Sequence, residues 1–246
     1  MWFESSLRSE QGKDSINNED YCHVDAKKGL FVVADGMGGR PGGKLASKTA
    51  VTAFVAQIGR LAGPARLQED TIHSAIATVN EQVRALSQAN PDMTGAGTTL
   101  TSFIVHENQG RTVHVGDSRV YLFRDNYLKQ LTTDHTLVSE LLERNHLSAE
   151  KAEHYPYRHV LSRSVGANET VKPDIGKLTI VAGDWFLLMT DGLSEVLDNE
   201  SIEQLIQANC RESAQKMCCV LVETVMKHQM YDDLTVIAIH IHEEVP

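Results

Sequence analysis

The chain has 246 residues, 41% hydrophobic and 23% charged, and no linker, repeat or low-complexity segment divides it, so we expect one domain over residues 1–246. A formal net charge of -10 without a basic block to offset it argues against nucleic-acid and membrane-surface partners. No apolar run reaches the roughly 20 residues of a membrane span, no signal peptide is evident, and four cysteines without a Cys-x-x-Cys motif predict reduced thiols in a cytoplasmic protein.

The first half of the chain predicts two strands, two helices and then a block of short strands. Apolar runs rich in Val, Ile, Leu and Phe and bounded by Gly and Asp are typical of buried strands, whereas apolar residues at helical spacing predict helices. The predicted elements are strands at 21–24 and 30–34, helices at 42–58 and 65–87, and strands at 98–105, 111–115, 119–123 and 128–131.

The second half begins with a broken helical pattern over residues 135–168, which we interpret as a flap-like insertion over a sheet edge. It contains predicted short helices at 136–144 and 148–154, and it is followed by strands at 178–181 and 184–190, helices at 201–208 and 212–228, and a strand at 234–241. Long helix pairs separated by blocks of strands do not alternate as βαβ units. The pattern favours an α+β fold with two packed, mostly antiparallel sheets flanked by helices.

Aspartates stand where the predicted strands stop. Asp35 follows Leu30 to Ala34, Asp191 follows Trp185 to Thr190, and Asp117, Asp20 and Asp232 lie beside other predicted strands. Any one of them could be a turn former, because Asp-Gly is common in turns. Several carboxylates converging at one sheet edge would repel each other unless cations lie between them. Oxygen ligands without a Cys/His set point to magnesium or manganese.

The motifs and their order resemble the metal-dependent serine/threonine protein phosphatases (the PPM or type 2C family) in their compact bacterial form. The matching motifs, between about Gln11 and Ile241, are Asn18-Glu19-Asp20, Asp35-Gly36-Met37-Gly38-Gly39, Gly97-Thr98-Thr99, Gly116-Asp117-Ser118-Arg119, Asp134-His135, Gly183-Asp184 with Asp191-Gly192-Leu193, and Asp232-Asp233-Leu234-Thr235. The resemblance implies a four-layer α-β-β-α sandwich. It also implies hydrolysis of phosphoserine and phosphothreonine in proteins, which opposes Ser/Thr kinase signalling.

The resemblance further implies a centre of two Mn²⁺ or Mg²⁺ ions, with room for a third. Asp35 would bridge the two core ions, and Asp191 and Asp232 would complete the protein ligands of one of them. The Gly36 carbonyl, with Glu19 and Asp20, would hold the other ion. Asp117 would hold a third, looser ion together with Asp191. Two divalent ions lower the pKa of a bridging water, so a hydroxide attacks phosphorus without a protein nucleophile.

The chain departs from the family pattern at the position expected to grip phosphate, where the usual Arg is replaced by Ser15. Lys13 and Arg8 are the nearby cations that could substitute, although a Lys point charge does not reproduce an Arg fork. The last motif usually reads Asp-Asn, and Asp233 therefore adds negative charge. These departures leave two alternatives open: a non-catalytic member that binds phosphoproteins, or a phosphatase of small phosphate esters.

Three histidines need separate interpretation. His135 could donate a proton to the leaving group or could equally be a hydrogen-bonded structural residue. His240 and His242 share one face of a strand as a metal pair would, but no third ligand is apparent, and we interpret them as a solvated strand end. We expect phosphorylated proteins and a cognate Ser/Thr kinase as partners, and a monomer.

Overall fold

Strands that are apolar on both faces build the centre of the molecule, as the continuous Val, Leu, Ile and Phe runs predict. The computed structural model describes residues 1–13, 15–37, 42–152, 155–228 and 231–243. Its strands are β1 (Trp2–Glu10), β2 (Tyr21–Asp25), β3 (Leu30–Ala34), β4 (Gly36–Met37), β5 (Gly97–Thr98), β6 (Leu100–His106), β7 (Gln109–Val115), β8 (Arg119–Arg124), β9 (Tyr127–Gln130), β10 (Asp174–Thr179), β11 (Trp185–Met189) and β12 (Leu234–His242). Its α-helices are α1 (Gly42–Ile58), α2 (Glu69–Ala89), α3 (Leu137–Glu143), α4 (Ala149–Ala152), α5 (Asp191–Ser194), α6 (Asn199–Asn209) and α7 (Ala214–Met226).

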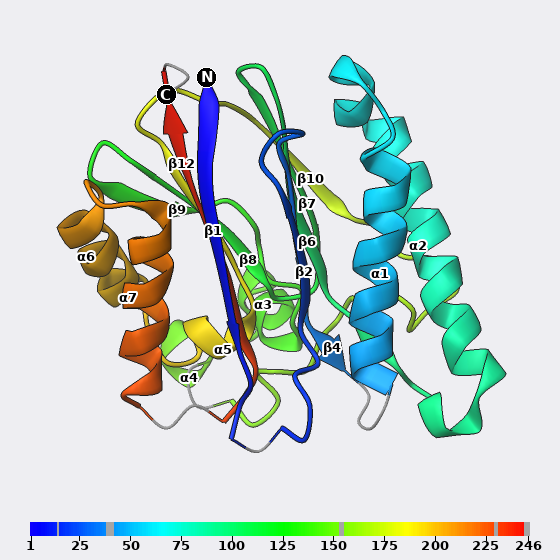
Figure 1. Cartoon of the computed structure of the whole chain (residues 1–246). Coiled ribbons are helices and arrows are strands. Elements are labelled where there is room, and N and C mark those ends of the chain that lie inside the picture. The colour runs from blue at the N-terminus through cyan, green and yellow to red at the C-terminus, as the bar shows by residue number, and fades with distance from the viewer. Residues whose placement is uncertain (14, 38–41, 153–154, 229–230, 244–246) are drawn as a thin grey trace.

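Two five-stranded antiparallel sheets pack face to face, and a helix pair covers the outer face of each (Figure 1). Sheet A has the order β1-β12-β11-β8-β9, and sheet B has the order β10-β7-β6-β3-β2. Helices α1 and α2 lie on sheet B, while α6 and α7 lie on sheet A (Figure 1). The four-layer α-β-β-α sandwich expected from the sequence is confirmed.

Successive side chains of each central strand point to opposite faces of its sheet, so the buried side chains form three layers: one between the two sheets and one under each helix pair. In β3, Leu30 and Val32 pack with the helix residues of α1 and α2, whereas Phe31 and Val33 face the other sheet. In β12, Ala238 packs under α6 and α7, and its neighbours on either side point between the sheets. The sheets are therefore rigid supports for whatever stands at their ends.

Several element boundaries differ from those predicted. Strand β1 was not predicted, because its only aliphatic or phenyl side chains are Phe3 and Leu7, and it lies at the edge of sheet A. The predicted strand 178–181 lies at 174–179 instead, since its pairing with β7 extends over polar residues. The predicted helix 65–87 is a 3₁₀ turn at Gly63–Leu67 followed by α2.

The segment predicted as a flap contains α3 and α4. An isolated bridge between Thr136 and Leu161 joins its two halves, and a second bridge from Val165 to Thr98 ties it to the rest of the chain. Gly38 and Gly39 of the glycine-rich motif, and the last two residues of the helix predicted at 148–154, lie outside the described residues. Within the described ranges, no helix combines the length and apolar character needed to cross a bilayer.

The close approach of α5 to the start of β12 yields a stability prediction. A Cβ at Gly192 would lie 2.1 Å from the Asp233 carbonyl oxygen, so we expect Gly192→Ala to lower the free energy of unfolding by about 3 kcal/mol. Gly95→Ala is the matched control. Gly95 has φ +82° but open space around it, and its substitution should cost only about 1 kcal/mol. Urea unfolding of both variants measures the difference, and equal losses would show that this contact is not tight.

Candidate active site

Carboxylates from five loops gather at one end of the two sheets. Asp35 follows β3, Asp117 follows β7, and Asp191 begins α5 after β11, while Asp20 and Asp232 come shortly before β2 and β12. This is the end that carries β4 and α5, opposite the end where β1 begins and β12 finishes (Figure 1). The sequence-predicted metal residues are thus brought together from both sheets.

Burial and mutual repulsion raise the pKa of the central carboxyls. Burial, followed by the charge of Asp191 and then that of Asp20, raises the pKa of Asp35 well above its ordinary value. The pKa of Asp20 rises to about 8, mainly through burial, and that of Asp191 rises to about 7 through burial and the charge of Asp232. These side chains therefore share one electrostatic field, which disfavours their ionisation in the absence of cations.

The outer members of the group behave in the same way. The pKa of Asp117 is raised well above its ordinary value, first by burial and then by Asp191. Burial and the charge of Asp233 raise the pKa of both Glu19 and Asp232. The pKa of every carboxyl predicted as a metal ligand is therefore raised when no cation is present.

Hydrogen bonds fix the loop that carries Asp35. Its backbone N–H donates to the Thr99 hydroxyl at 2.8 Å, and its carbonyl accepts from the Thr99 N–H at 2.9 Å and the Thr98 hydroxyl at 2.7 Å. The Thr99 and Ser118 hydroxyls are 2.8 Å apart, which links this loop to the one that bears Asp117. The Gly97-Thr98-Thr99 motif thus positions a carboxylate.

Glycines let the backbone approach itself beside Glu19. A Cβ at Gly36 would lie 2.1 Å from the Gly43 carbonyl oxygen, so neither position has room for a side chain. A Cβ at Gly43 would lie 2.6 Å from the Gly36 oxygen and 2.8 Å from Glu19 Oε2. Two oxygens therefore border the same small space, as expected for the Gly36 carbonyl and Glu19 acting together.

Asp233 has a role that the sequence did not reveal. Its Oδ1 accepts from the Gly12 N–H at 2.9 Å, and its Oδ2 accepts from the Glu19 N–H at 2.6 Å. The residue is 4% exposed, and both carboxylate oxygens are occupied by backbone donors. An Asn would lose one of these acceptors, so the negative charge holds the loop that carries Glu19. The spacing of the motif contains no signal for this role.

The two cations predicted to hold phosphate differ in their surroundings. Arg8 lies on β1, where its guanidinium pairs with Glu10 at 3.0 Å and with Glu223 at 3.5 Å, and it does not border the cavity described below. Its charge is thus engaged elsewhere. Lys13 is exposed and directly follows Gly12, whose Cβ position would contact the backbone of Asp232. Ser15, at the expected Arg position, donates its N–H to the Gly12 carbonyl at 3.3 Å.

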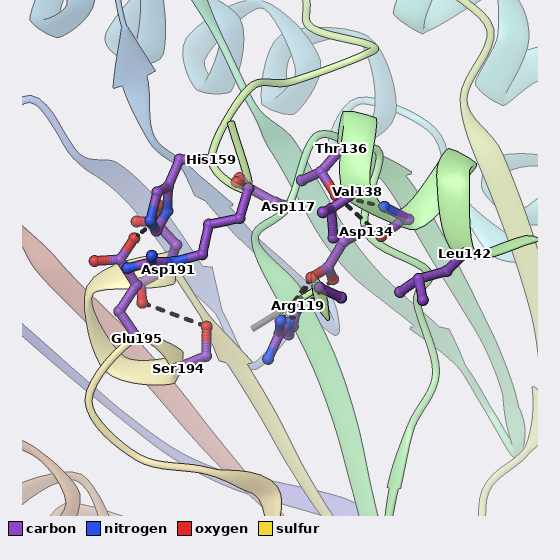
Figure 2. A pocket seen from close by; sticks show the side chains of 13 residues that line it. Asp117, Arg119, Asp134, Thr136, Val138, Leu142, His159, Asp191, Ser194 and Glu195 are labelled. Atoms are coloured by element: carbon purple, nitrogen blue, oxygen red, sulfur yellow. Dashed lines mark hydrogen bonds and ion pairs between the residues drawn. The ribbon is translucent and has the colours of Figure 1, made fainter. Parts of the chain in front are cut away.

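A cavity of about 680 Å³ opens between these carboxylates and the predicted flap. Asp117 and Asp191 border it together with Val138 and Leu142 from α3 (Figure 2). Arg119 stands on one side in a bidentate pair with Asp134, donating from Nη2 to Oδ2 at 2.6 Å and from Nε to Oδ1 at 3.0 Å. The motif residues Arg119 and Asp134 therefore brace the wall of the cavity beside Asp117.

His159 and Glu195 stand on the other side of the cavity, and neither was identified as a site residue from the sequence. His159 Nδ1 is 2.6 Å from Glu195 Oε1, and potential ligand atoms of these two residues and Asp191 all lie within 4.8 Å of one another (Figure 2). Arg158 also borders the cavity. A single His inside a broken helical pattern carries no spacing signal, and only the folded chain brings it to Asp191.

His135 is a structural residue. Its Nδ1 lies 3.1 Å from the Gly116 N–H, which can only donate, so Nε2 carries the ring proton and donates to Asp174 at 3.0 Å. Asp174 also accepts from Arg163 at 2.7 Å. Because both ring nitrogens are engaged and the residue is 3% exposed, the structure favours the structural alternative over proton donation.

Comparisons with known proteins agree with this geometry. The profile of the family described as protein phosphatase 2C matches residues 9–234. The protein phosphatase PhpP of Streptococcus pneumoniae is 33% identical over 210 residues, which cover 84% of this chain and 85% of PhpP. The serine/threonine protein phosphatase PstP of Mycobacterium tuberculosis is 34% identical over 233 residues, covering 94% of this chain and 44% of PstP.

Solved structures extend the likeness to the whole fold. The crystal structure of the Mycobacterium tuberculosis serine/threonine phosphatase PstP superposes with a TM-score of 0.90 at 30% identity, covering 99% of this chain and 100% of the other. The PstP catalytic domain in complex with two manganese ions gives a TM-score of 0.87 at 29% identity, with 98% and 99% coverage. The chain belongs to the protein phosphatase 2C family and is a serine/threonine protein phosphatase of the bacterial type.

Proposed function

We propose that this chain removes phosphate from phosphoserine and phosphothreonine in proteins, using two Mn²⁺ or Mg²⁺ ions held by Asp35, Asp191, Asp232, the Gly36 carbonyl, Glu19 and Asp20. Asp117 with Asp191 would hold a third ion. The observation that carries the proposal is the convergence of buried carboxyls with raised pKa values at one end of the sheets. The PstP structure with two manganese ions supports the choice of metal.

The residues present fit such ions. Asp20 Oδ1 and Asp191 Oδ1 are buried without a hydrogen-bond partner among the described residues, although buried polar atoms are normally paired. The Gly36 oxygen and Glu19 Oε2 border one small space beside Gly43. The donors are all oxygens, which suits Mg²⁺ and Mn²⁺. Unpaired buried oxygens and crowded negative charge are what bound cations would satisfy.

These positions suggest a separate role for each group in the reaction. When two divalent ions are bound, they supply a nucleophilic water at neutral pH and offset the charge of the phosphate oxygens. Thr98 and Thr99 hold the backbone of Asp35, and this keeps its carboxyl within the electrostatic field of Asp20 and Asp191. Asp233 orients Glu19 through its backbone N–H. Lys13 would meet the substrate phosphate, and Val138 and Leu142 would contact the polypeptide around the phosphorylated residue.

Several further expectations belong to this proposal. Residues 1–246 would form a single catalytic domain, and residues 135–168 would act as its flap, because their helix α3 borders the cavity. Partners would be phosphorylated proteins and a cognate Ser/Thr kinase, with the enzyme a monomer. The cytoplasm would be its compartment, and four cysteines free of disulfides support that location.

Metal-free protein should lose stability as the pH rises. The folded-state pKa values of about 8 for Asp20 and about 7 for Asp191 exceed the unfolded value of 3.8. Between about pH 4 and pH 8 the folded state therefore binds more protons, and the free energy of unfolding falls as pH increases. Melting of chelated protein at pH 5.5 and pH 8 should show this fall, and added Mn²⁺ should remove most of it.

The same reasoning applies to a neutral replacement. Without metal at pH 8, Asp191→Asn should be more stable than the wild type by roughly 1–3 kcal/mol, since it removes a disfavoured charge. It should gain little from Mn²⁺. A variant that is less stable than the wild type in chelator would contradict the electrostatic account.

Activity should depend on metal and on its proposed ligands. Hydrolysis of a phosphothreonine peptide should stop in chelator and return with Mn²⁺ or Mg²⁺. Asp35→Asn and Asp191→Asn should each lower kcat about a hundredfold or more, while Asp117→Asn should have a smaller effect because it would hold a looser ion. Asp125→Asn, in an exposed turn, is the control. Metal content is measured alongside rate, and wild-type turnover by Asp35→Asn would rule out its bridging role.

A positive charge at position 15 should improve substrate capture. Ser15→Arg should lower KM for a phosphopeptide roughly fivefold, equivalent to about 1 kcal/mol in an open, salt-screened cleft. Lys13→Ala should raise KM if Lys13 meets the phosphate. Arg8→Ala should leave KM unchanged, because Arg8 is paired with Glu10 and Glu223. Steady-state kinetics are compared at one ionic strength. No change in any variant would mean that phosphate is held without these side chains.

A further inference from the structure

Two histidines and a glutamate meet at the end of sheet A opposite the active site. His240 and His242 lie on one face of β12, and Glu4 of β1 is the direct cross-strand partner of His240. Potential ligand atoms of the three side chains all lie within 4.8 Å of one another. The third ligand absent from the sequence pattern is therefore supplied by the strand that the sequence did not predict.

The distances approach those of a tetrahedral metal site. His242 Nε2 is 3.3 Å from Glu4 Oε2. Metal–nitrogen and metal–oxygen bonds of about 2.0–2.1 Å at tetrahedral angles place ligand atoms about 3.3 Å apart. One pair already has this separation, and small side-chain rotations of His240 would bring the third atom in. Two His and one Glu are a ligand set that Zn²⁺ uses in proteins.

Neighbouring groups hold the three side chains in place. Glu4 Oε1 accepts from the Ala214 N–H at 2.9 Å at the start of α7, which leaves Oε2 directed to the histidines. The indole of Trp185 stacks on His240 with ring centres 4.2 Å apart, and that of Trp2 stacks on His242 at 4.3 Å. Such outer contacts orient ligands in established metal sites.

A hydrogen bond between Glu4 and His242 accounts for only two of the three groups. Among the described residues, no hydrogen bond engages a ring nitrogen of His240. The three side chains are half-buried, so their nitrogen and oxygen atoms are accessible to an ion from solvent. A shared cation gives His240 a partner and offsets the charge of Glu4.

We propose that Glu4, His240 and His242 bind one divalent transition-metal ion of the zinc type, separately from the carboxylate centre. Imidazole selects Zn²⁺, Co²⁺, Ni²⁺ or Cu²⁺, whereas the all-oxygen centre suits Mg²⁺ and Mn²⁺. The two sites lie at opposite ends of β12, about 25 Å apart at the strand rise per residue. The ion fastens the edge strand β1 to β12 and, through Glu4, to the start of α7.

The test uses the two tryptophans as built-in reporters, since the chain has only two and each stacks on one of the histidines. Tag-free full-length protein is held in millimolar Mg²⁺ and titrated with Co²⁺, which quenches nearby indoles. We expect saturable quenching at one equivalent, visible absorption of tetrahedral cobalt, and recovery of fluorescence when Zn²⁺ displaces it. The fluorescence readout does not depend on phosphatase activity, so its outcome tests this metal site separately from the proposed function.

Variants decide whether these residues are responsible. His240→Ala and His242→Ala should each weaken Co²⁺ binding at least tenfold, and the double variant should abolish the quenching. Glu4→Gln, which keeps the acceptor for the Ala214 N–H, should weaken it about tenfold. His73→Ala on α2 is the matched control and should bind like the wild type. Retained Mn²⁺-dependent phosphatase activity reports folding. Non-saturable quenching, or equal quenching in wild type and Glu4→Gln, would overturn the proposal.

Discussion

Repulsion among buried carboxylates is the constraint around which this molecule is organised. Asp20, Asp35 and Asp191 are brought together from both sheets, and burial and mutual charge raise the pKa of each. Without a counter-charge such an arrangement costs folding free energy, so the rest of the structure must supply that free energy. The three-layer core supplies it, because strands that are apolar on both faces resist the relaxation that would let the carboxylates separate.

The loops at the sheet ends then fix the positions of the carboxyls. Thr98 and Thr99 fasten the loop of Asp35, and Asp233 fastens the loops of Gly12 and Glu19 with both carboxylate oxygens. Close backbone approach at Gly36 and Gly192 brings the loops nearer than any side chain would allow. The motifs shared with the protein phosphatase 2C family thus mostly hold the backbone in place, and only some of their residues belong to the cluster of buried carboxyls.

The sequence predicted the parts of the molecule whose signals are local. Continuous apolar runs such as Leu30 to Ala34 predict buried strands without any alternation, and the aspartates that follow some of these runs, such as Asp35 and Asp191, mark the sheet edge. Strand β1 escaped prediction because an edge strand with polar side chains has no such run. The roles of Asp233, His159 and Glu4 escaped for another reason. Each depends on a partner more than 30 residues away, and no residue spacing within a motif encodes that contact.

The pairing of β1 with β12 joins the first strand of the fold to its last. Sheet B, with strands between residues 21 and 179, can form from earlier parts of the chain, and it brings Asp35 and Asp117 with it. Asp191 and Asp232 arrive only with the final two strands. During synthesis the emerging polypeptide therefore exposes an open edge at β1 and only part of the carboxyl cluster. Long-range pairing such as that of β1 with β12 forms slowly. Phosphatase activity would therefore appear only after β12 has emerged from the ribosome and paired with β1 and β11.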